Sequence, residues 1–239
     1  MFYVYISPAK ALNKENESLF EISTPVYQDV ADSVANILKT FDESYIKKTM
    51  KVNDDLAKKV YKYYQEFNIN LAPAIFKYNG LVYKNIAPNS MNDDELNYLH
   101  DHLLIGSGLY GILKAFDGIS NYRLELNKKI KEIPDMTKLY QDKIQNYFNE
   151  DDVIINLASE EYSTLIQNVK CKVVRINFIK HDHEKCTMLQ THGKIYRGKM
   201  VRFLASNNVT SIEDITKFQD KNLQLLSYND NEVNFIEVA

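Results

Sequence analysis

The stretch Val153-Ile154-Ile155-Asn156-Leu157-Ala158-Ser159-Glu160-Glu161-Tyr162 changes character at its midpoint. Its first half is a short continuous apolar run, which is typical of a strand buried in a sheet. Its second half is polar and resembles the start of a helix. A buried strand that leads directly into a helix indicates a sheet packed against helices.

Other strands are expected on either side of this stretch. They are Met1–Ile6, residues 171–179, residues 186–191, and a closing hairpin of 223–228 with 233–238 around Asn229-Asp230. Asn79-Gly80, which lies between two apolar runs, predicts a further hairpin or tight turn.

Helices are expected wherever apolar residues recur at three- and four-residue steps behind a capping residue. Four of these segments follow Pro25 (Val26, Val30, Val34, Ile37, Leu38, Phe41), Asn53 (Leu56, Val60, Tyr64, Phe67), Ser90 with Asp93, and Asp135. A fifth helix is expected over Lys194–Ala205, and a short sixth one is expected after Ser211. Together the elements predict an α+β, or mixed α/β, fold in which helices surround a mixed sheet.

The composition is that of a folded globular protein. The chain has 239 residues, 45% of them hydrophobic and 26% charged, with no repeat or flexible linker, so we expect one domain over residues 1–239. No apolar run is long enough to span a bilayer, and two cysteines are too few for a disulfide scaffold. These features predict a cytoplasmic protein without a membrane partner.

The net charge of −3 gives no global attraction to nucleic acid, so any polyanion would need a local basic patch. One candidate patch is the expected helix that carries Lys194, Arg197, Lys199 and Arg202, where Lys194 and Arg197 lie one turn apart. The alternative is a solvated basic helix face without a ligand.

Gly106-Ser107-Gly108-Leu109-Tyr110-Gly111 is the second candidate. Three glycines in six positions indicate either a helix-hairpin-helix element, whose amides hold a DNA phosphate, or a corner built for close packing. The spacing also fits a dinucleotide fingerprint, but that motif follows a strand and a helix is expected here.

Asp117 and the segment Tyr122-Arg123-Leu124-Glu125 form the third candidate. Arg123 could bind phosphate while Glu125 or Asp117 acts as acid or base, or Arg123 and Glu125 could simply pair. Ser7 and Ser159 each follow an expected strand, where a hydroxyl can face a ligand, and Lys10 is a possible phosphate contact or nucleophile. Ser159 could equally be only a helix cap.

The run His181-Asp182-His183-Glu184-Lys185-Cys186 contains metal-ligand residue types. Its spacing lacks the paired motifs that hold zinc, so we expect no metal site and no cofactor. Iron binding by His181, His183 and Glu184 is retained as a weaker alternative.

Six blocks, taken in order, resemble the YaaA peroxide stress family. They are Ser7-Pro8-Ala9-Lys10, Tyr78-Asn79-Gly80-Leu81-Val82-Tyr83, Ser107-Gly108-Leu109-Tyr110-Gly111, Tyr122-Arg123-Leu124-Glu125, residues 155–162, and Arg197-Gly198 with Met200, Arg202 and Phe203. The resemblance implies a single-domain mixed α/β fold with a helix-hairpin-helix-like element. It also implies a role in limiting iron-linked peroxide damage, and DNA binding in a positively charged cleft.

Carried over block by block, the resemblance implies a set of DNA-binding residues. They are Lys10, Ser107, Gly108, Tyr110, Gly111, Tyr122, Arg123, Asn156, Ser159, Tyr162, Lys194, Arg197 and Arg202. We therefore expect a monomer that binds double-stranded or locally unpaired DNA without strong sequence specificity. The alternative is a glycosylase- or lyase-like enzyme acting on a nucleobase or nucleotide-like substrate, with Ser7, Lys10, Asp117 and Glu125 as catalytic candidates.

Overall fold

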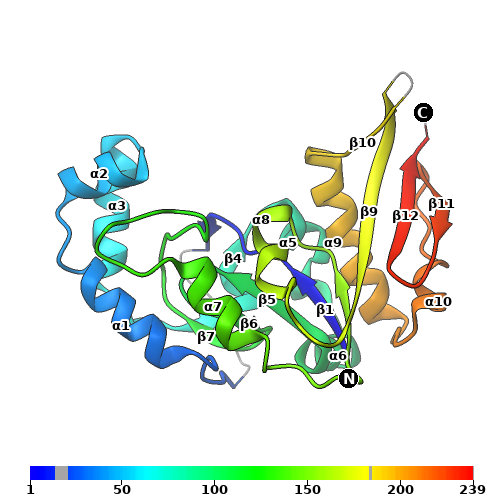
Figure 1. The fold of residues 1–239 in the computed structure, drawn as a ribbon, viewed down its shortest axis with the longest axis horizontal. Helices are drawn as coiled ribbons and strands as arrows, with labels where there is room; N and C mark the ends of the chain where they lie inside the picture. The colour runs from blue at the N-terminus through cyan, green and yellow to red at the C-terminus, as the bar shows by residue number, and fades with distance from the viewer. Residues whose placement is uncertain (14–20, 183–184, 239) are drawn as a thin grey trace.

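The computed structural model describes residues 1–13, 21–182 and 185–238. Its centre is an eight-stranded mixed sheet with the strand order β11-β12-β9-β8-β1-β5-β6, and β10 pairs with β9 (Figure 1). The strands are β1 Phe2–Ile6, β5 Leu103–Ser107, β6 Gly111–Lys114, β8 Val153–Asn156, β9 Lys172–Asp182, β10 Lys185–Met188, β11 Leu223–Tyr228 and β12 Glu232–Glu237. The mixed sheet and its flanking helices confirm the expected fold class.

Strand β1 lies at the centre of the sheet and pairs in parallel with both neighbours. Val4 is opposite Leu103 of β5 on one side and opposite Ile155 of β8 on the other. The chain reaches β5 first and β8 later, so the direction of strand addition reverses at β1. In open α/β sheets, such a reversal opens a ligand crevice at the carboxyl ends of the strands. Ser7 and Ser159 lie just beyond those ends.

Two short two-stranded sheets and a set of helices complete the fold. Strand β2 (Ala11–Leu12) pairs with β4 (Tyr78–Asn79), and β3 (Ala72–Pro73) pairs with β7 (Gly118–Ile119). The helices are α1 Gln28–Leu38, α2 Glu43–Met50, α3 Asp54–Gln65, α4 Ala74–Lys77, α5 Leu81–Ile86, α6 Asp93–His102, α7 Met136–Ile144, α8 Glu160–Ser163, α9 Thr191–Ser206 and α10 Ile212–Ile215, with 3₁₀ turns η1 Pro88–Ser90 and η2 Thr164–Ile166. In Figure 1, α1 to α3 lie at one end of the molecule and β9, β11 and β12 at the other.

Three of the expected helix caps are present. The side chains of Asn53, Asp135 and Ser211 accept hydrogen bonds from the first turns of α3, α7 and α10. The cap expected at Ser90 is wrong, because the capping box of α6 is formed by Asn92 and Glu95. Ser90 instead ends η1, where its hydroxyl donates to the carbonyl of Ala87 at 2.8 Å.

Two expectations about glycine segments are also wrong. Gly80 does not form a hairpin but precedes α5, while Asn79 pairs with Ala11. Gly106–Gly111 does not join two helices, because the apolar run before it is β5 and the run after it is β6, and these two strands pair antiparallel. The helix-hairpin-helix expected at this segment is therefore a β-hairpin. A helical hairpin is found elsewhere, where α2 and α3 are joined by residues 51–53.

The hydrophobic core is one cluster whose members range from Phe2 to Phe235, and it includes residues of the central strands and of α1, α3, α6, α7 and α9. The proposal that residues 1–239 form one domain rests on this continuity. Both cysteines are free thiols, with Cys171 buried and Cys186 exposed. Within the described part of the chain, no helix has the length and apolarity needed to cross a bilayer.

Helix α9 packs directly against α5, and Gly198 makes this close approach possible. A Cβ at Gly198 would collide with the carbonyl oxygen of Val82 and lie 2.7 Å from the Cβ of Asn85. Because Val82 and Asn85 belong to α5, the two helices meet at backbone distance. This contact fixes the position of Arg197, the residue next to Gly198.

We predict that Gly198→Ala lowers the free energy of unfolding by roughly 1–3 kcal/mol, because the added methyl overpacks the contact between the helices. Urea denaturation would measure the change. Gly193→Ala in the same helix is the matched control, since its Cβ would lie 3.4 Å from the Cβ of Leu189, an ordinary contact. Equal losses in the two variants would contradict this account of Gly198.

Candidate functional site

A cavity of about 470 Å³ lies at the carboxyl ends of the central strands. Five segments that are distant in the sequence contribute to its wall. The lining residues are Ser7, Pro8, Ala9, Lys10 and Ala11; Asn79, Gly80, Leu81, Val82 and Tyr83; Tyr122, Arg123, Leu124 and Glu125; Leu157, Ser159, Glu161 and Tyr162; and Lys194 with Arg197. This is the place where the reversal of strand order predicts a ligand site.

Ser7 and Ser159 meet in this cavity because β1 and β8 are parallel neighbours. The Ser7 hydroxyl donates to the Ser159 hydroxyl at 3.1 Å and accepts from the Ser159 amide at 2.8 Å. The Tyr83 hydroxyl donates to the Ser7 carbonyl at 3.0 Å. Neither serine is hydrogen-bonded to a described histidine or carboxylate, so neither has the adjacent base that activates a serine nucleophile.

Glu125 is shared by two cations on the cavity wall. Its Oε1 atom lies 2.8 Å from Nη2 of Arg123 and 3.3 Å from Nζ of Lys10. Burial alone would raise the pKa of Glu125, but Arg123 and then Lys10 outweigh it and hold the pKa below its ordinary value. Glu125 is therefore a carboxylate at neutral pH. The expected pair of Arg123 and Glu125 is present, and it lies within the cavity and not on an open surface.

The 122–126 segment is held in place by the glycine hairpin and by tyrosines. A Cβ at Gly108 would collide with the carbonyl oxygen of Leu124 and lie 2.9 Å from the amide nitrogen of Leu126. This is the close-packing role considered for the glycines. The Tyr64 hydroxyl donates to the carbonyl of Arg123 at 2.5 Å.

Tyr122 lines the cavity, and its hydroxyl is hydrogen-bonded within the protein interior. The hydroxyl lies 2.8 Å from the Ser107 hydroxyl and 2.6 Å from the Tyr78 hydroxyl. Burial raises the pKa of Tyr122 to about 12, although these two hydrogen bonds oppose the shift. Tyr122 is thus neutral and fixed, which suits a ring that contacts a ligand by packing.

Lys194 and Arg197 form the α9 wall of the cavity. Arg197 has no ion-pair partner among the described residues, and the charge that acts on it is that of Arg175 of β9, which itself pairs with Glu160. Burial and the neighbouring Arg175 both lower the pKa of Arg197. An arginine stays protonated in proteins, so this guanidinium is a cation without a counter-ion.

Two buried side-chain nitrogen atoms in the described residues lack a hydrogen-bond partner, and both belong to arginines that line this cavity. They are Nε of Arg123 and Nε of Arg197. Buried polar groups in proteins are almost always satisfied, so these two donors are open to acceptors that solvent or a ligand supplies.

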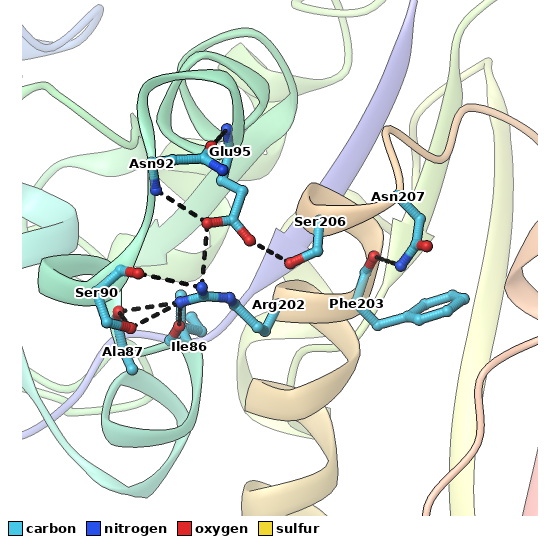
Figure 2. Close-up of polar contacts among 9 residues, drawn as sticks. All are labelled: Ile86, Ala87, Ser90, Asn92, Glu95, Arg202, Phe203, Ser206 and Asn207. Carbon is cyan, nitrogen blue, oxygen red and sulfur yellow. Dashed lines mark hydrogen bonds and ion pairs between the residues drawn. The ribbon is translucent and has the colours of Figure 1, made fainter.

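Arg202 was expected in the same site, but the structure gives it a different environment (Figure 2). It does not line the cavity. Its guanidinium donates to Glu95 at 3.0 Å, to the Ser90 hydroxyl at 2.9 Å and to the carbonyl of Ala87 at 3.3 Å. Glu95 also accepts from the Ser206 hydroxyl and from the Asn92 amide. Arg202 therefore joins α9 to η1 and α6, and most of its N–H donors are not free to bind a phosphate.

The other candidates outside the cavity wall are buried supports. Ser107 and Tyr110 are fully buried, with Tyr110 accepting from the Ser120 amide at 3.2 Å. Asn156 bonds to Ser163 and to the Ala158 amide. Gly108 packs on the 124–126 backbone, and Gly111 begins β6 beneath the Tyr140 ring.

Asp117, a candidate acid or base, lies in a separate, smaller cavity. It accepts from the Ser23 hydroxyl at 2.7 Å and from the Lys114 amide at 2.8 Å. Burial raises its pKa, and these hydrogen bonds only partly oppose that effect. Asp117 anchors the 21–24 segment and does not share a cavity with Glu125.

The structure adds lining residues that were not singled out from the sequence, notably Tyr83, Leu157 and Glu161. All three fall within the sequence blocks that carried the family resemblance, so membership of a block could have identified them as site residues. Arg175, which acts on Arg197 but does not line the cavity, had no such signal, because its position opposite Asn156 depends on the parallel pairing of β9 with β8.

Strands β9 and β10 carry the described residues of the run from 181 to 186. His181 and Cys186 are cross-strand partners, with 3.8 Å between Nδ1 and Sγ. His183 and Glu184 lie outside the described residues, and the remaining residues contain no group of three metal-ligand side chains. The iron alternative therefore gains no support from the described geometry.

Comparisons with known proteins agree with the six sequence blocks. The model of the family described as peroxide stress protein YaaA matches residues 2–228. The chain belongs to the YaaA peroxide stress family. It is 36% identical over 223 residues to a UPF0246 protein of Rickettsia bellii, covering 89% of this chain and 90% of that protein. A UPF0246 protein of Agathobacter rectalis is 34% identical over 224 residues, and one of Ligilactobacillus salivarius is 36% identical over 225, each covering 90% of both chains.

We predict unequal stability effects for two arginines of α9 in this family member. Arg202→Met should lower the free energy of unfolding by roughly 2–4 kcal/mol at pH 7, because it strands the buried Glu95 carboxylate. Arg197→Met should cost less than about 1 kcal/mol, since it removes a cation without a partner. Urea denaturation of both variants would test this contrast.

The Arg202 effect should also depend on pH. The hydrogen bond from Ser206, then the Asn92 amide and Arg202, hold the pKa of Glu95 below its ordinary 4.5 despite burial. A lowered folded-state pKa means that the stabilisation is complete above about pH 4.5 and lost as the pH falls through the folded-state value. The difference between wild type and Arg202→Met should therefore shrink as the pH falls below about 4.5. An unchanged difference would contradict the role of Glu95.

Proposed function

We propose that this protein binds DNA during peroxide stress by taking a nucleotide and its phosphates into the cavity that Ser7, Lys10, Arg123, Glu125 and Arg197 line. Membership of the YaaA family supports a role in peroxide stress. DNA binding, and through it protection against iron-linked oxidative damage, is the finer part of the proposal. A cytoplasmic location and a monomeric state remain predictions.

The charge of the cavity wall is the observation that supports the proposal. The wall holds four cations, Lys10, Arg123, Lys194 and Arg197, and two carboxylates, Glu125 and Glu161. The excess is two positive charges on a chain whose net charge is −3. A local positive field on an acidic protein favours an anionic ligand at this one place.

The shape and lining of the cavity support a nucleotide as that ligand. Its volume of about 470 Å³ is within the range of sites for small ligands, roughly 300–1,000 Å³. Tyr83, Tyr122 and Tyr162 line the wall with Leu157 and Val82, so aromatic and apolar residues are available to contact an unpaired base. Stacking on aromatic rings tolerates any base, which agrees with weak sequence specificity.

We predict that affinity for a fluorescein-labelled bubble duplex falls with salt by about 0.9 log units per decade for each duplex phosphate contacted. The double variant Lys194→Gln/Arg197→Gln should bind more weakly and with a shallower salt slope, because up to two contacts are lost. Fluorescence anisotropy at several salt concentrations would measure both quantities.

Lys199→Gln is the matched control, since Lys199 lies on the same helix but pairs with Asp220 and does not line the cavity. It should retain the affinity and slope of the wild type. An affinity that changes neither with salt concentration nor in the double variant would refute the DNA-binding proposal.

A second candidate function is an enzyme that acts on a nucleobase or nucleotide-like substrate. It is favoured by the convergence of Lys10 and Glu125, 3.3 Å apart, in the cavity at the ends of parallel strands. In this candidate Lys10 is the nucleophile and Glu125 exchanges protons with it. Ser7 is less suited, because its hydroxyl is occupied by Ser159.

If this second function holds, incubation with lesion-bearing oligonucleotides or nucleosides should yield a new product. Lys10→Gln and Glu125→Gln should each reduce the rate at least 100-fold, the lower end for a positioned acid or base. Denaturing gels and liquid chromatography would follow the reaction. Absence of any product with all tested lesions would leave only the binding function.

A further inference from the structure

The charged residues of α9 divide into two groups. Lys199 pairs with Asp220 at 2.5 Å and Arg202 pairs with Glu95 at 3.0 Å, and neither lines the cavity. Lys194 and Arg197 have no acidic partner among the described residues, and both line the cavity. The two cations that face the cavity are therefore the two that the protein leaves without a counter-ion.

The opposite wall differs, because its cations are already neutralised in part. Lys10 and Arg123 share the carboxylate of Glu125. Glu161, the other acidic lining residue, accepts from the Asn127 amide at 3.2 Å and pairs with no cation among the described residues. The uncompensated positive charge therefore lies on the α9 side, close to Arg175 of β9.

Arg197 carries a donor that an anionic ligand can use. Its Nε atom is buried and unsatisfied, and a second guanidinium, Arg175, lies near enough to disfavour its charge. Helix α9 does not need this arrangement for its position, since Gly198 and Arg202 already fix it to α5, η1 and α6. A buried cation beside another cation is stabilised when an anion binds between or beside them.

We infer that the α9 wall is a subsite for the phosphomonoester of a single nucleotide, with Lys194 and Arg197 as its ligands. The inference deepens the proposed function and rests on it for the choice of a nucleotide. A phosphomonoester carries close to two negative charges at neutral pH, which matches two uncompensated cations. The sugar and base would then lie against Tyr83, Tyr122 and Leu157, and Nε of Arg123 would donate to an acceptor on that part of the ligand.

The same phosphomonoester can come from a free deoxynucleoside monophosphate or from the 5′-phosphorylated end of a DNA strand. Isothermal titration calorimetry can separate these sources. The probes are the four deoxynucleoside monophosphates, the matching deoxynucleosides, and one single-stranded oligonucleotide with and without its 5′-phosphate. The proteins are wild type, Arg197→Gln, Lys194→Gln and the control Lys199→Gln.

We predict that at least one monophosphate binds the wild type and that its deoxynucleoside binds at least 10-fold more weakly. Arg197→Gln should weaken monophosphate binding roughly 10- to 100-fold, the range for a hydrogen bond to a charged group, and Lys199→Gln should change it less than 2-fold. A gain on adding the 5′-phosphate to the oligonucleotide would identify strand ends as a source. Monophosphate binding without any oligonucleotide binding would identify free nucleotides, and it would refute DNA binding while the subsite stands.

Three results would overturn the subsite. The first is equal affinity for monophosphates and deoxynucleosides, and the second is no binding of any monophosphate by a wild type that still binds DNA. The third is loss of binding in Lys199→Gln equal to that in Arg197→Gln. The comparison of ligands on the wild type does not depend on how well any variant folds.

Discussion

The parallel pairing of β1 with both β5 and β8 is the constraint on which the site depends. Parallel neighbours bring their carboxyl ends to one edge of the sheet, so chain segments about 150 residues apart, at Ser7 and Ser159, come within hydrogen-bond distance. The amide of Ser159 donates to the hydroxyl of Ser7, which fixes the two loops to each other, and the hydroxyl of Tyr83 donates to the carbonyl of Ser7, which fixes them to α5. All other walls of the cavity are arranged around this junction.

The distribution of charge separates structural cations from those with a ligand-binding role. Arg202 and Lys199 are surrounded by acceptors and hold helices and turns together, whereas Arg197 is kept partly buried without any. A cation that is bonded to acceptors stabilises the fold, whereas a partly buried cation without acceptors lowers stability unless an anion is bound. Proteins retain the second arrangement where binding or catalysis requires it.

Local patterns in the sequence were enough for most of the fold. Apolar runs identified β1 and β8, and the caps at Asn53, Asp135 and Ser211 were correct because each depends on one side chain and its own first turn. The glycine segment was misassigned because the run from Leu103 to Ile105 is buried on both faces, and such runs do not distinguish a strand from a helix.

The site itself was only partly predictable, for a different reason. Ser7, Lys10, Tyr122, Arg123, Glu125, Ser159, Tyr162, Lys194 and Arg197, nine of the sequence candidates, do line one cavity. Residue type and block could not distinguish Arg197 from Arg202, because the difference lies in Glu95 and in the carbonyls after α5, which come near only through packing. Arg175 likewise depends on sheet order, which no local pattern encodes.

The backbone contact at Gly198 has a mechanical consequence. It joins α9 to α5, and both helices supply residues to the cavity wall, Lys194 and Arg197 from one and Leu81, Val82 and Tyr83 from the other. Two sides of the site therefore move as one stiff body. The segments at residues 7–10 and 122–125 are anchored as well, the first by Tyr83 and Ser159 and the second by Tyr64 and the hairpin at Gly108, so the cavity is largely preformed for an incoming molecule.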